Sequence, residues 1–78
     1  MNDAEPLSAG VYEHWKGGRY LVLGVGRYDP TDEDVVVYVR LYGRPGLPLS
    51  VRPRADFSAV VDDGGVRRPR FRYLGDRE

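Results

Sequence analysis

The amino-acid sequence predicts a small all-β protein, in which five strands form an SH3-like, partly open barrel with one short helical turn. Three observations predict this class. Segments rich in Val, Tyr and Leu recur along the chain with Gly, Pro or Asp between them, and helical periodicity is nearly absent. A chain of 78 residues is also long enough for only one small domain. Curling a short antiparallel sheet into a barrel leaves few exposed edges and encloses a core of this size.

The expected strands follow one another at residues 10–15, 19–28, 35–42, 49–52 and 70–74. Gly17 and Gly18 between the first two strands predict a tight hairpin turn, since glycine tolerates positive φ. The second strand is apolar on both faces, as in the centre of a curved sheet, and Gly24 within it is an expected bend or bulge. An acidic loop at 29–34 and a Gly- and Pro-rich loop at 43–48 connect the next strands.

Two further segments complete the predicted domain. Residues 54–61 follow a proline and precede a pair of glycines, which predicts a single short turn of helix. Residues 1–9 are expected to be a flexible N-terminal tail before a single SH3-like β domain that spans residues 10–75.

Period-two alternation assigns the side chains of each strand to two faces. Along the third strand, one face is aliphatic and the other mixes tyrosine with arginine. We expect the aliphatic set to form the core, namely Val35, Val37, Val39 and Leu41. Leu49 and Val51 of the fourth strand follow the same division, and Tyr38 is expected on the opposite, outer face.

Composition excludes several kinds of function. With no Cys, the chain has no disulfide, thiolate metal cluster or thiol nucleophile, and its single His cannot form a multi-histidine site, so we predict no metal ion and no cofactor. No apolar run approaches the roughly 20 residues that cross a bilayer, which predicts a cytoplasmic protein without membrane contact. Twelve acidic and twelve basic residues balance, so nucleic acid would bind only at a local basic patch.

The first strand carries the first candidate site. Tyr12, His14 and Lys16 alternate along it and therefore share one face. A histidine there transfers protons or accepts a hydrogen bond, and a lysine holds an anion, so the three together would form a small polar site. The alternative is structural: Tyr12 packs in part, His14 bonds a backbone carbonyl and Lys16 flanks the glycine turn.

The second candidate site combines tyrosine and arginine from several strands. Tyr38, Arg40 and Tyr42 lie on one face of the third strand. If the strands pair as neighbours, either Arg52 with Ser50 or Arg70 with Arg72 would come beside this face. Interleaved Tyr and Arg side chains stack on bases and neutralise phosphates, as in proteins that bind single-stranded nucleic acid. The alternative is that these residues form cross-strand pairs that cover a solvated sheet.

Several short motifs together resemble a bacterial family called "domain of unknown function 1653". The motifs are Gly10-Val11-Tyr12-Glu13-His14-Trp15-Lys16-Gly17, Val36-Val37-Tyr38 with Leu41-Tyr42-Gly43, Val51-Arg52-Pro53 with Asp56-Phe57, and Pro69-Arg70-Phe71-Arg72-Tyr73. They occur in the family's order along most of the chain. The resemblance implies a small bacterial domain with SH3-like β architecture and no established activity. Its polar positions include the candidate residues named above, whereas the loop at 28–34 departs from the family pattern.

Three functions remain open. The leading hypothesis is a binding or interaction module that presents a surface of Tyr, His, Lys and Arg to an anionic ligand, a nucleotide, a nucleic acid or a peptide. The candidate ligand-binding residues are Tyr12, His14, Lys16, Tyr38, Tyr42, Arg52 and Arg70. The alternatives are a homodimeric structural or accessory protein, and a small hydrolase or transferase with His14 as general base. We assign no catalytic residue, because no nucleophile motif accompanies this histidine.

Overall fold

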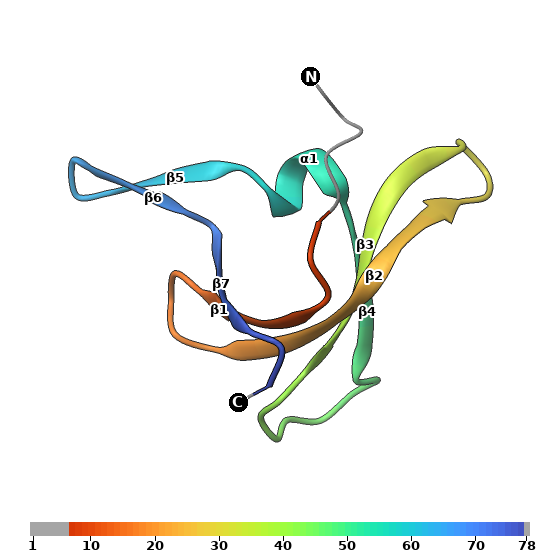
Figure 1. Ribbon diagram of the computed structural model, residues 1–78, viewed down its shortest axis with the longest axis horizontal. Helices are drawn as coiled ribbons and strands as arrows, with labels where there is room; N and C mark the ends of the chain where they lie inside the picture. Colours follow the sequence, from red (N-terminus) through yellow and green to blue (C-terminus); the bar gives the residue numbers. More distant parts are fainter. Residues whose placement is uncertain (1–6, 78) are drawn as a thin grey trace.

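The computed structural model describes residues 7–77, which form seven strands and one short helix (Figure 1). In chain order the elements are β1 (Gly10–His14), β2 (Arg19–Tyr28), β3 (Glu33–Arg40), β4 (Leu49–Pro53), α1 (Arg54–Phe57), β5 (Val60–Asp63), β6 (Val66–Pro69) and β7 (Phe71–Gly75). The prediction of an all-β protein with one helical turn is confirmed. Within the described residues, no helix is long and apolar enough to cross a membrane.

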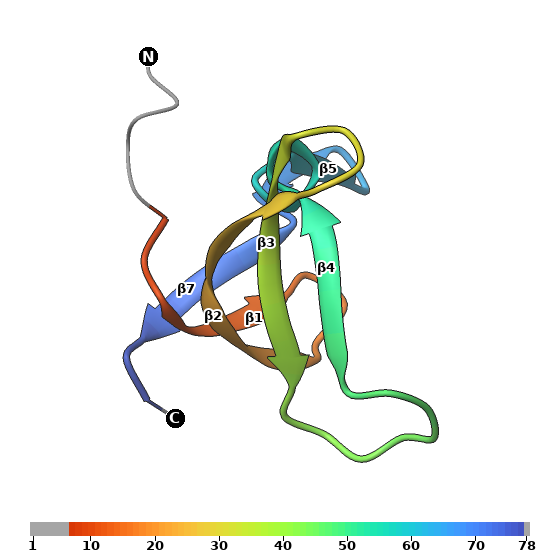
Figure 2. The same cartoon turned by 90° about the vertical axis from the view of Figure 1, so that its right-hand side faces the viewer.

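The five predicted strands form one antiparallel sheet, in the order β4-β3-β2-β1-β7. Figure 2 shows that this sheet curls strongly from β4 at one edge to β7 at the other. The two edge strands do not pair with each other, so the barrel is open on one side, as expected. A register shift between Val22 and Gly24, with a φ of 155° at Gly24, bends β2 at the predicted bulge.

β5 and β6 form a separate two-stranded hairpin that the sequence pattern does not predict. The predicted helical segment reaches residue 61, whereas α1 ends at Phe57 and the chain continues into β5. Gly64 and Gly65, both with positive φ, form the turn of the hairpin. All four residues of β6 are exposed, and a strand without an apolar face has no period-two pattern. Hydrophobic alternation therefore gives no sign of this hairpin.

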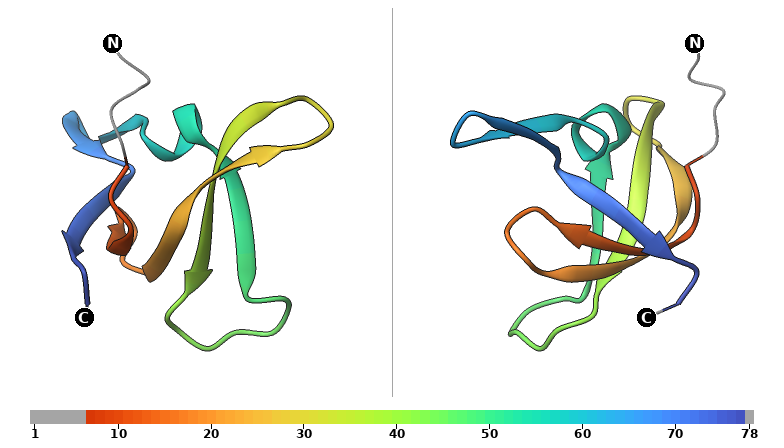
Figure 3. Two further views of the ribbon diagram at one scale, coloured as in Figure 1. Left: turned by 45° about the vertical axis from the view of Figure 1, so that its right-hand side comes forward. Right: turned by 60° about the vertical axis from the view of Figure 1, so that its left-hand side comes forward.

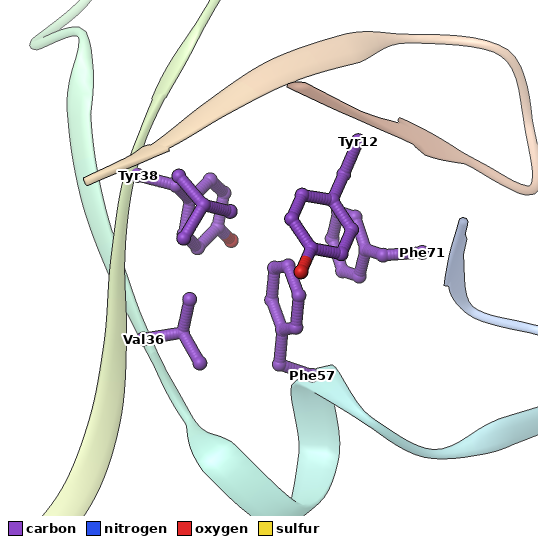
Figure 4. Packing of buried hydrophobic residues seen from close by; sticks show 6 residues of the cluster. Tyr12, Val36, Tyr38, Phe57 and Phe71 are labelled. Atoms are coloured by element: carbon purple, nitrogen blue, oxygen red, sulfur yellow. The ribbon is translucent and has the colours of Figure 1, made fainter. Parts of the chain in front are cut away.

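The core lies on the concave side of the sheet and is mainly aromatic (Figure 4). Its buried members are Tyr12, Val22, Val36, Tyr38, Phe57 and Phe71. Phe57 from α1 stacks on Phe71 from β7, with ring centroids 4.1 Å apart and an angle of 5° between the ring planes. Because α1 follows β4 directly, this stack joins the two edges of the sheet across the open side of the barrel.

The two core tyrosines keep hydrogen-bond partners for their hydroxyl groups. The Tyr12 hydroxyl donates to the backbone carbonyl of Ser8 (2.8 Å), and the Tyr38 hydroxyl accepts a hydrogen bond from Nε of Arg52 (3.2 Å). Such partners remove the cost of burying a phenol. Leu7 also packs against the core, so residues 7 and 8 of the predicted tail contact the domain, while residues 1–6 lie outside the described residues.

The predicted assignment of the faces of β3 is wrong. Val36 and Tyr38 point into the core and are 0% and 6% exposed, whereas Leu49 and Val51 are each 57% exposed on the outer side. Val35 is buried but lies outside the core cluster. Of the remaining predicted core residues, Val37 and Val39 are half-buried, and Leu41, just beyond the end of β3, is exposed. Both faces of β3 are apolar, and large aromatic rings fill the narrow concave side of a curled sheet more completely than valines do.

The loop between β3 and β4 is organised by Arg40, the last residue of β3. Its guanidinium donates hydrogen bonds to three backbone carbonyls, those of Leu47 (2.6 Å), Arg44 (2.8 Å) and Gly46 (2.7 Å). A guanidinium can reach several carbonyls at once because its five N–H donors form a rigid fork. The loop therefore takes its shape from one side chain.

We expect Arg40→Lys to lower the free energy of unfolding by about 1–2 kcal/mol, since a single ammonium nitrogen cannot occupy the separate positions from which Nη1 and Nη2 donate. Amide hydrogen exchange in the loop should accelerate at the same time. Chemical denaturation and exchange followed by NMR measure the two effects. Arg77→Lys is the matched control, because the side chain of Arg77 is 87% exposed beside Asp76. Equal behaviour of the two variants would contradict the role of Arg40.

Candidate functional site

Side chains close the open side of the barrel around Asp56 of α1. Nη1 of Arg52, from β4, lies 2.6 Å from Oδ2 of Asp56, and Nη2 of Arg70, just before β7, lies 3.6 Å from Oδ1. Nε of Arg70 also donates a hydrogen bond to the backbone carbonyl of Asp56 (3.1 Å). The Arg52 guanidinium lies 5.7 Å from the centroid of the Phe71 ring. One carboxylate thus binds two arginines from the two edges of the sheet.

His14, the last residue of β1, lies next to this cluster. Its ring packs edge-on against Phe71, with ring centroids 4.9 Å apart. Burial lowers the pKa of His14 below its ordinary value, and the positive charges of Arg52, Arg70 and Lys16 lower it further. The imidazole is therefore mainly neutral at pH 7.

A backbone contact determines which nitrogen of the neutral imidazole carries the proton. The Lys16 N–H donates to Nδ1 of His14 (3.1 Å), so the proton is assigned to Nε2. No residue between 7 and 77 accepts a hydrogen bond from Nε2. His14 thus offers a neutral hydrogen-bond donor, and its lone pair is already engaged. This arrangement suits hydrogen bonding to an anion better than removal of a proton from a substrate.

A cleft of about 610 Å³ lies between two hairpins beside His14. The β1–β2 turn and the β5–β6 hairpin project to the same side of the molecule (Figure 1; Figure 3, right). β1 and β7 stay paired as far as the hydrogen bond from the Trp15 N–H to the Arg70 carbonyl (2.9 Å), and beyond it the two segments diverge. The lining includes His14, Trp15 and Lys16 on one wall and Arg67, Arg68 and Pro69 on the other.

The lining of the cleft carries more positive than negative charge. Lys16 and Arg67, from opposite walls, form no ion pair with any residue from 7 to 77. Nζ of Lys16 lies over the Trp15 ring, 5.3 Å from its centroid. The remaining charges of the lining are paired at 2.8 Å, Arg68 with Asp63 and Arg72 with Glu13. Two cations therefore stay available to a ligand.

The structure brings four of the seven predicted ligand-binding residues into one region. His14 and Lys16 line the cleft. Arg52 and Arg70 lie close enough to His14 to lower its pKa, although both guanidinium groups are engaged with Asp56. These basic groups therefore lie near His14, but only Lys16 among the cations is without an ion pair in the described part of the chain.

The three predicted tyrosines do not line the cleft. Tyr12 and Tyr38 belong to the core and are each 6% exposed, so they have almost no surface to offer a ligand. The Tyr42 hydroxyl lies 2.6 Å from that of Tyr20, and the Tyr42 ring packs against Gly18 of the β1–β2 turn. Burial and this hydrogen bond raise the pKa of Tyr20 to about 12, while the same bond lowers the pKa of Tyr42. The tyrosine pair supports the turn from outside the cleft.

The second wall of the cleft is not among the residues predicted from the sequence. Arg67 and Arg68 belong to β6, a strand without an apolar face. The Gly64-Gly65 pair is the signal that reveals it, because the Gly17-Gly18 pair predicts the first hairpin by the same rule. Trp15 is also absent from the predicted set, since β1 ends at His14 and the alternation of a strand does not apply in the turn that follows.

The chemistry of the cleft is that of hydrogen-bond donors and positive charge. Across residues 7–77, no group of three or more His, Asp or Glu side chains is placed to hold a metal ion. The neutral imidazole N–H, an ammonium and a guanidinium all favour a negatively charged ligand.

The fold and the cleft define a small, partly open β barrel with a basic cleft between two hairpins. The chain belongs to a family described as proteins of unknown function, DUF1653, whose model matches residues 10–73. It is similar to the crystal structure of a DUF1653 protein from Bordetella bronchiseptica, with 52% sequence identity, coverage of 88% of each chain and a TM-score of 0.86. Comparison with curated proteins gives no match. The family resemblance of the sequence motifs is confirmed.

Proposed function

We propose that this domain is a binding module for an anionic ligand, which it holds in the cleft between the β1–β2 turn and the β5–β6 hairpin. The observation that carries the proposal is the pair of cations on opposite walls, Lys16 and Arg67, which have no ion-pair partner among residues 7–77. Cations that line a concave site without being neutralised raise the local concentration of anions. The volume of the cleft, about 610 Å³, lies within the range of ligand sites, about 300–1,000 Å³.

His14 adds a directional contact to this charge. Its Nε2–H is a donor without a protein acceptor in the described chain, and the neutral state of the ring leaves that donor in place at pH 7. Arg52 and Arg70, held by Asp56, act on the ligand through their charge at a distance.

Exposed charges set the strength that such a site can reach. Each exposed ion pair contributes about 1 kcal/mol or less, and one hydrogen bond contributes about as much, so a small free anion should bind with a dissociation constant on the order of 10 mM. Tighter binding requires a ligand that makes further contacts along the cleft.

We expect the pKa of His14 to rise when inorganic pyrophosphate occupies the cleft. In the free protein, three nearby cations contribute to lowering this pKa, and a bound anion offsets their repulsion of the imidazolium. NMR titration of the His14 Hε1 signal, in pyrophosphate and in chloride at equal ionic strength, measures the difference.

Charge variants show whether this change arises in the cleft. Arg67→Gln should weaken pyrophosphate binding about two- to fivefold. Arg27→Gln is the matched control, because Arg27 pairs with Asp29 and Asp32 in the acidic loop. If the pKa of His14 does not respond to pyrophosphate, or if both variants weaken binding equally, the cleft is not the anion site.

A further inference from the structure

We propose that the anionic ligand of this cleft is an extended acidic peptide segment, which adds as a third strand to the free edge of β6. This inference rests on the proposed function, because it names the class of ligand for the same cleft. It also assigns a role to the hairpin that hydrophobic alternation does not reveal.

The edge of the β5–β6 hairpin, rather than one of its faces, borders the cleft. All four residues of β6 line the cleft, whereas β5 contributes only Asp63 beside the turn. If a face of the hairpin bordered the cleft, alternate residues of both β5 and β6 would line it. Within residues 7–77, β6 pairs with β5 and with no other strand, so the edge that borders the cleft is unpaired.

The register of the hairpin identifies the backbone groups on this free edge. The Arg70 N–H donates to the Ala59 carbonyl (2.9 Å), which makes these two residues a hydrogen-bonded pair. Antiparallel pairs alternate, so Val61 and Arg68 form the next hydrogen-bonded pair. Arg67 and its partner Asp62 lie between them and form a non-hydrogen-bonded pair. The N–H and C=O of Arg67 therefore point away from β5. An arriving strand can exchange two backbone hydrogen bonds with Arg67.

The opposite wall offers side chains but no free strand edge. In the β1–β2 turn, the His14 N–H donates to the Gly18 carbonyl and the Gly17 N–H donates to the His14 carbonyl, each at 2.7 Å. The Lys16 N–H is bound to the imidazole. A strand that docks on β6 would thus meet the ammonium group of Lys16 and the indole of Trp15 across the cleft.

Charge and geometry together favour an acidic peptide over a nucleotide. Lys16 and Arg67 attract carboxylates in the same way as phosphates. A nucleotide would stack on Trp15, the single indole of the chain, and the ammonium group of Lys16, 5.3 Å from the ring centroid, competes for one face of that ring. The free N–H and C=O of Arg67 match the backbone of an extended peptide, whose side chains then alternate between the two sides of the new strand.

Titration of the full chain with a short, blocked peptide of alternating Thr and Glu tests this inference. The Arg67 amide proton should shift downfield and exchange more slowly when the peptide binds. The same peptide with N-methyl groups on its backbone keeps its charge but loses its donors, and it should bind about tenfold more weakly. Equal binding of the two peptides would show that charge alone holds the ligand, and strand addition would be wrong.

Two variants at one position separate charge from backbone pairing. Arg67→Gln removes the charge, whereas Arg67→Pro also removes the N–H, which an edge strand tolerates where that group is unpaired. Both variants should weaken pyrophosphate binding equally, but Arg67→Pro should weaken peptide binding about threefold more than Arg67→Gln. Equal effects of the two variants on the peptide would overturn the inference. The methylated peptide supplies the same test on the unaltered protein if Arg67→Pro does not fold.

Further titrations separate failure of the inference from failure of the proposed function. Pyrophosphate binding without peptide binding leaves the anion site in place and excludes strand addition. Tighter binding of ADP than of the acidic peptide, with shifts at the Trp15 indole, would identify a nucleotide as the ligand and overturn the inference. If neither pyrophosphate nor the peptide binds, the proposed function and the inference both fail.

Discussion

Phe57→Ala should lower the free energy of unfolding by about 3–5 kcal/mol, the range for removal of a buried aromatic ring. Phe57 is 2% exposed and is the only buried side chain of α1. Its ring stacks on Phe71 at 4.1 Å and also contacts the rings of Tyr12 (5.4 Å) and Tyr38 (5.6 Å). The substitution therefore leaves a cavity at the centre of the core and detaches the helix that joins the two sheet edges. Small domains have only about 5–15 kcal/mol of stability, so the loss would be a large fraction.

Urea denaturation followed by the fluorescence of Trp15, the single tryptophan, measures this loss. Phe57→Leu retains most of the buried volume and should cost less than the alanine variant. Leu47→Ala is the surface control, because Leu47 is 88% exposed, and it should change stability by less than about 0.5 kcal/mol. A loss below about 1 kcal/mol for Phe57→Ala would show that the aromatic stack does not hold the core together.

Gly10→Ala should destabilise the protein by about 2–4 kcal/mol through backbone strain and overpacking. Gly10 has a φ of 137°, which side-chain-bearing residues rarely adopt, and a Cβ atom there would lie 2.5 Å from the carbonyl oxygen of Gly75. The same atom would lie 3.0 Å from the Tyr73 ring. Backbone on the opposing strand cannot move aside as a flexible side chain can, so β1 and β7 would separate where β1 begins.

Gly43→Ala is the matched control for this variant. A Cβ atom at Gly43 would have no neighbouring atom within 4 Å, and Gly43 is not among the glycines with positive φ. A Gly-to-Ala change at a compatible position leaves stability nearly unchanged or raises it slightly. Thermal unfolding of both variants compares the two positions, and similar melting temperatures would contradict the close approach of β1 and β7 at Gly10.

The positions of the strands could be predicted from local signals, whereas the face of the sheet that forms the core could not. Runs of Val and Tyr bounded by Gly and Pro place β1 to β4 and β7 close to their observed positions. Both faces of β3 are apolar, so alternation alone does not tell whether Val36 or Val37 faces the core. The curvature of the whole sheet determines which face is buried, because α1 covers only the concave side. Curvature depends on pairing between distant residues, which no single strand encodes.

The candidate site was predictable to a similar degree. Alternation along the first strand pairs His14 with Lys16, and both line the cleft, although Lys16 lies in the turn. Arg52 and Arg70 are predicted ligand contacts, but Asp56 engages both. That contact depends on β4 and β7 facing each other across the open side, which is a consequence of topology rather than of local sequence. Arg67 could not be predicted in this way, because its strand carries no apolar pattern.

The closure around Asp56 joins the two edges of this barrel by side-chain contacts rather than by strand pairing. In a closed barrel, strand number and the stagger of the hydrogen-bond register determine the diameter. Here β4 and β7 share no strand pairing, and the two edges are joined through Arg52, Asp56 and Arg70 together with the aromatic stack beneath them. A substitution at position 56 would alter these contacts without changing the register of any strand pair. The closure of this barrel can therefore change by substitution of side chains while the strand pairing of the sheet is kept.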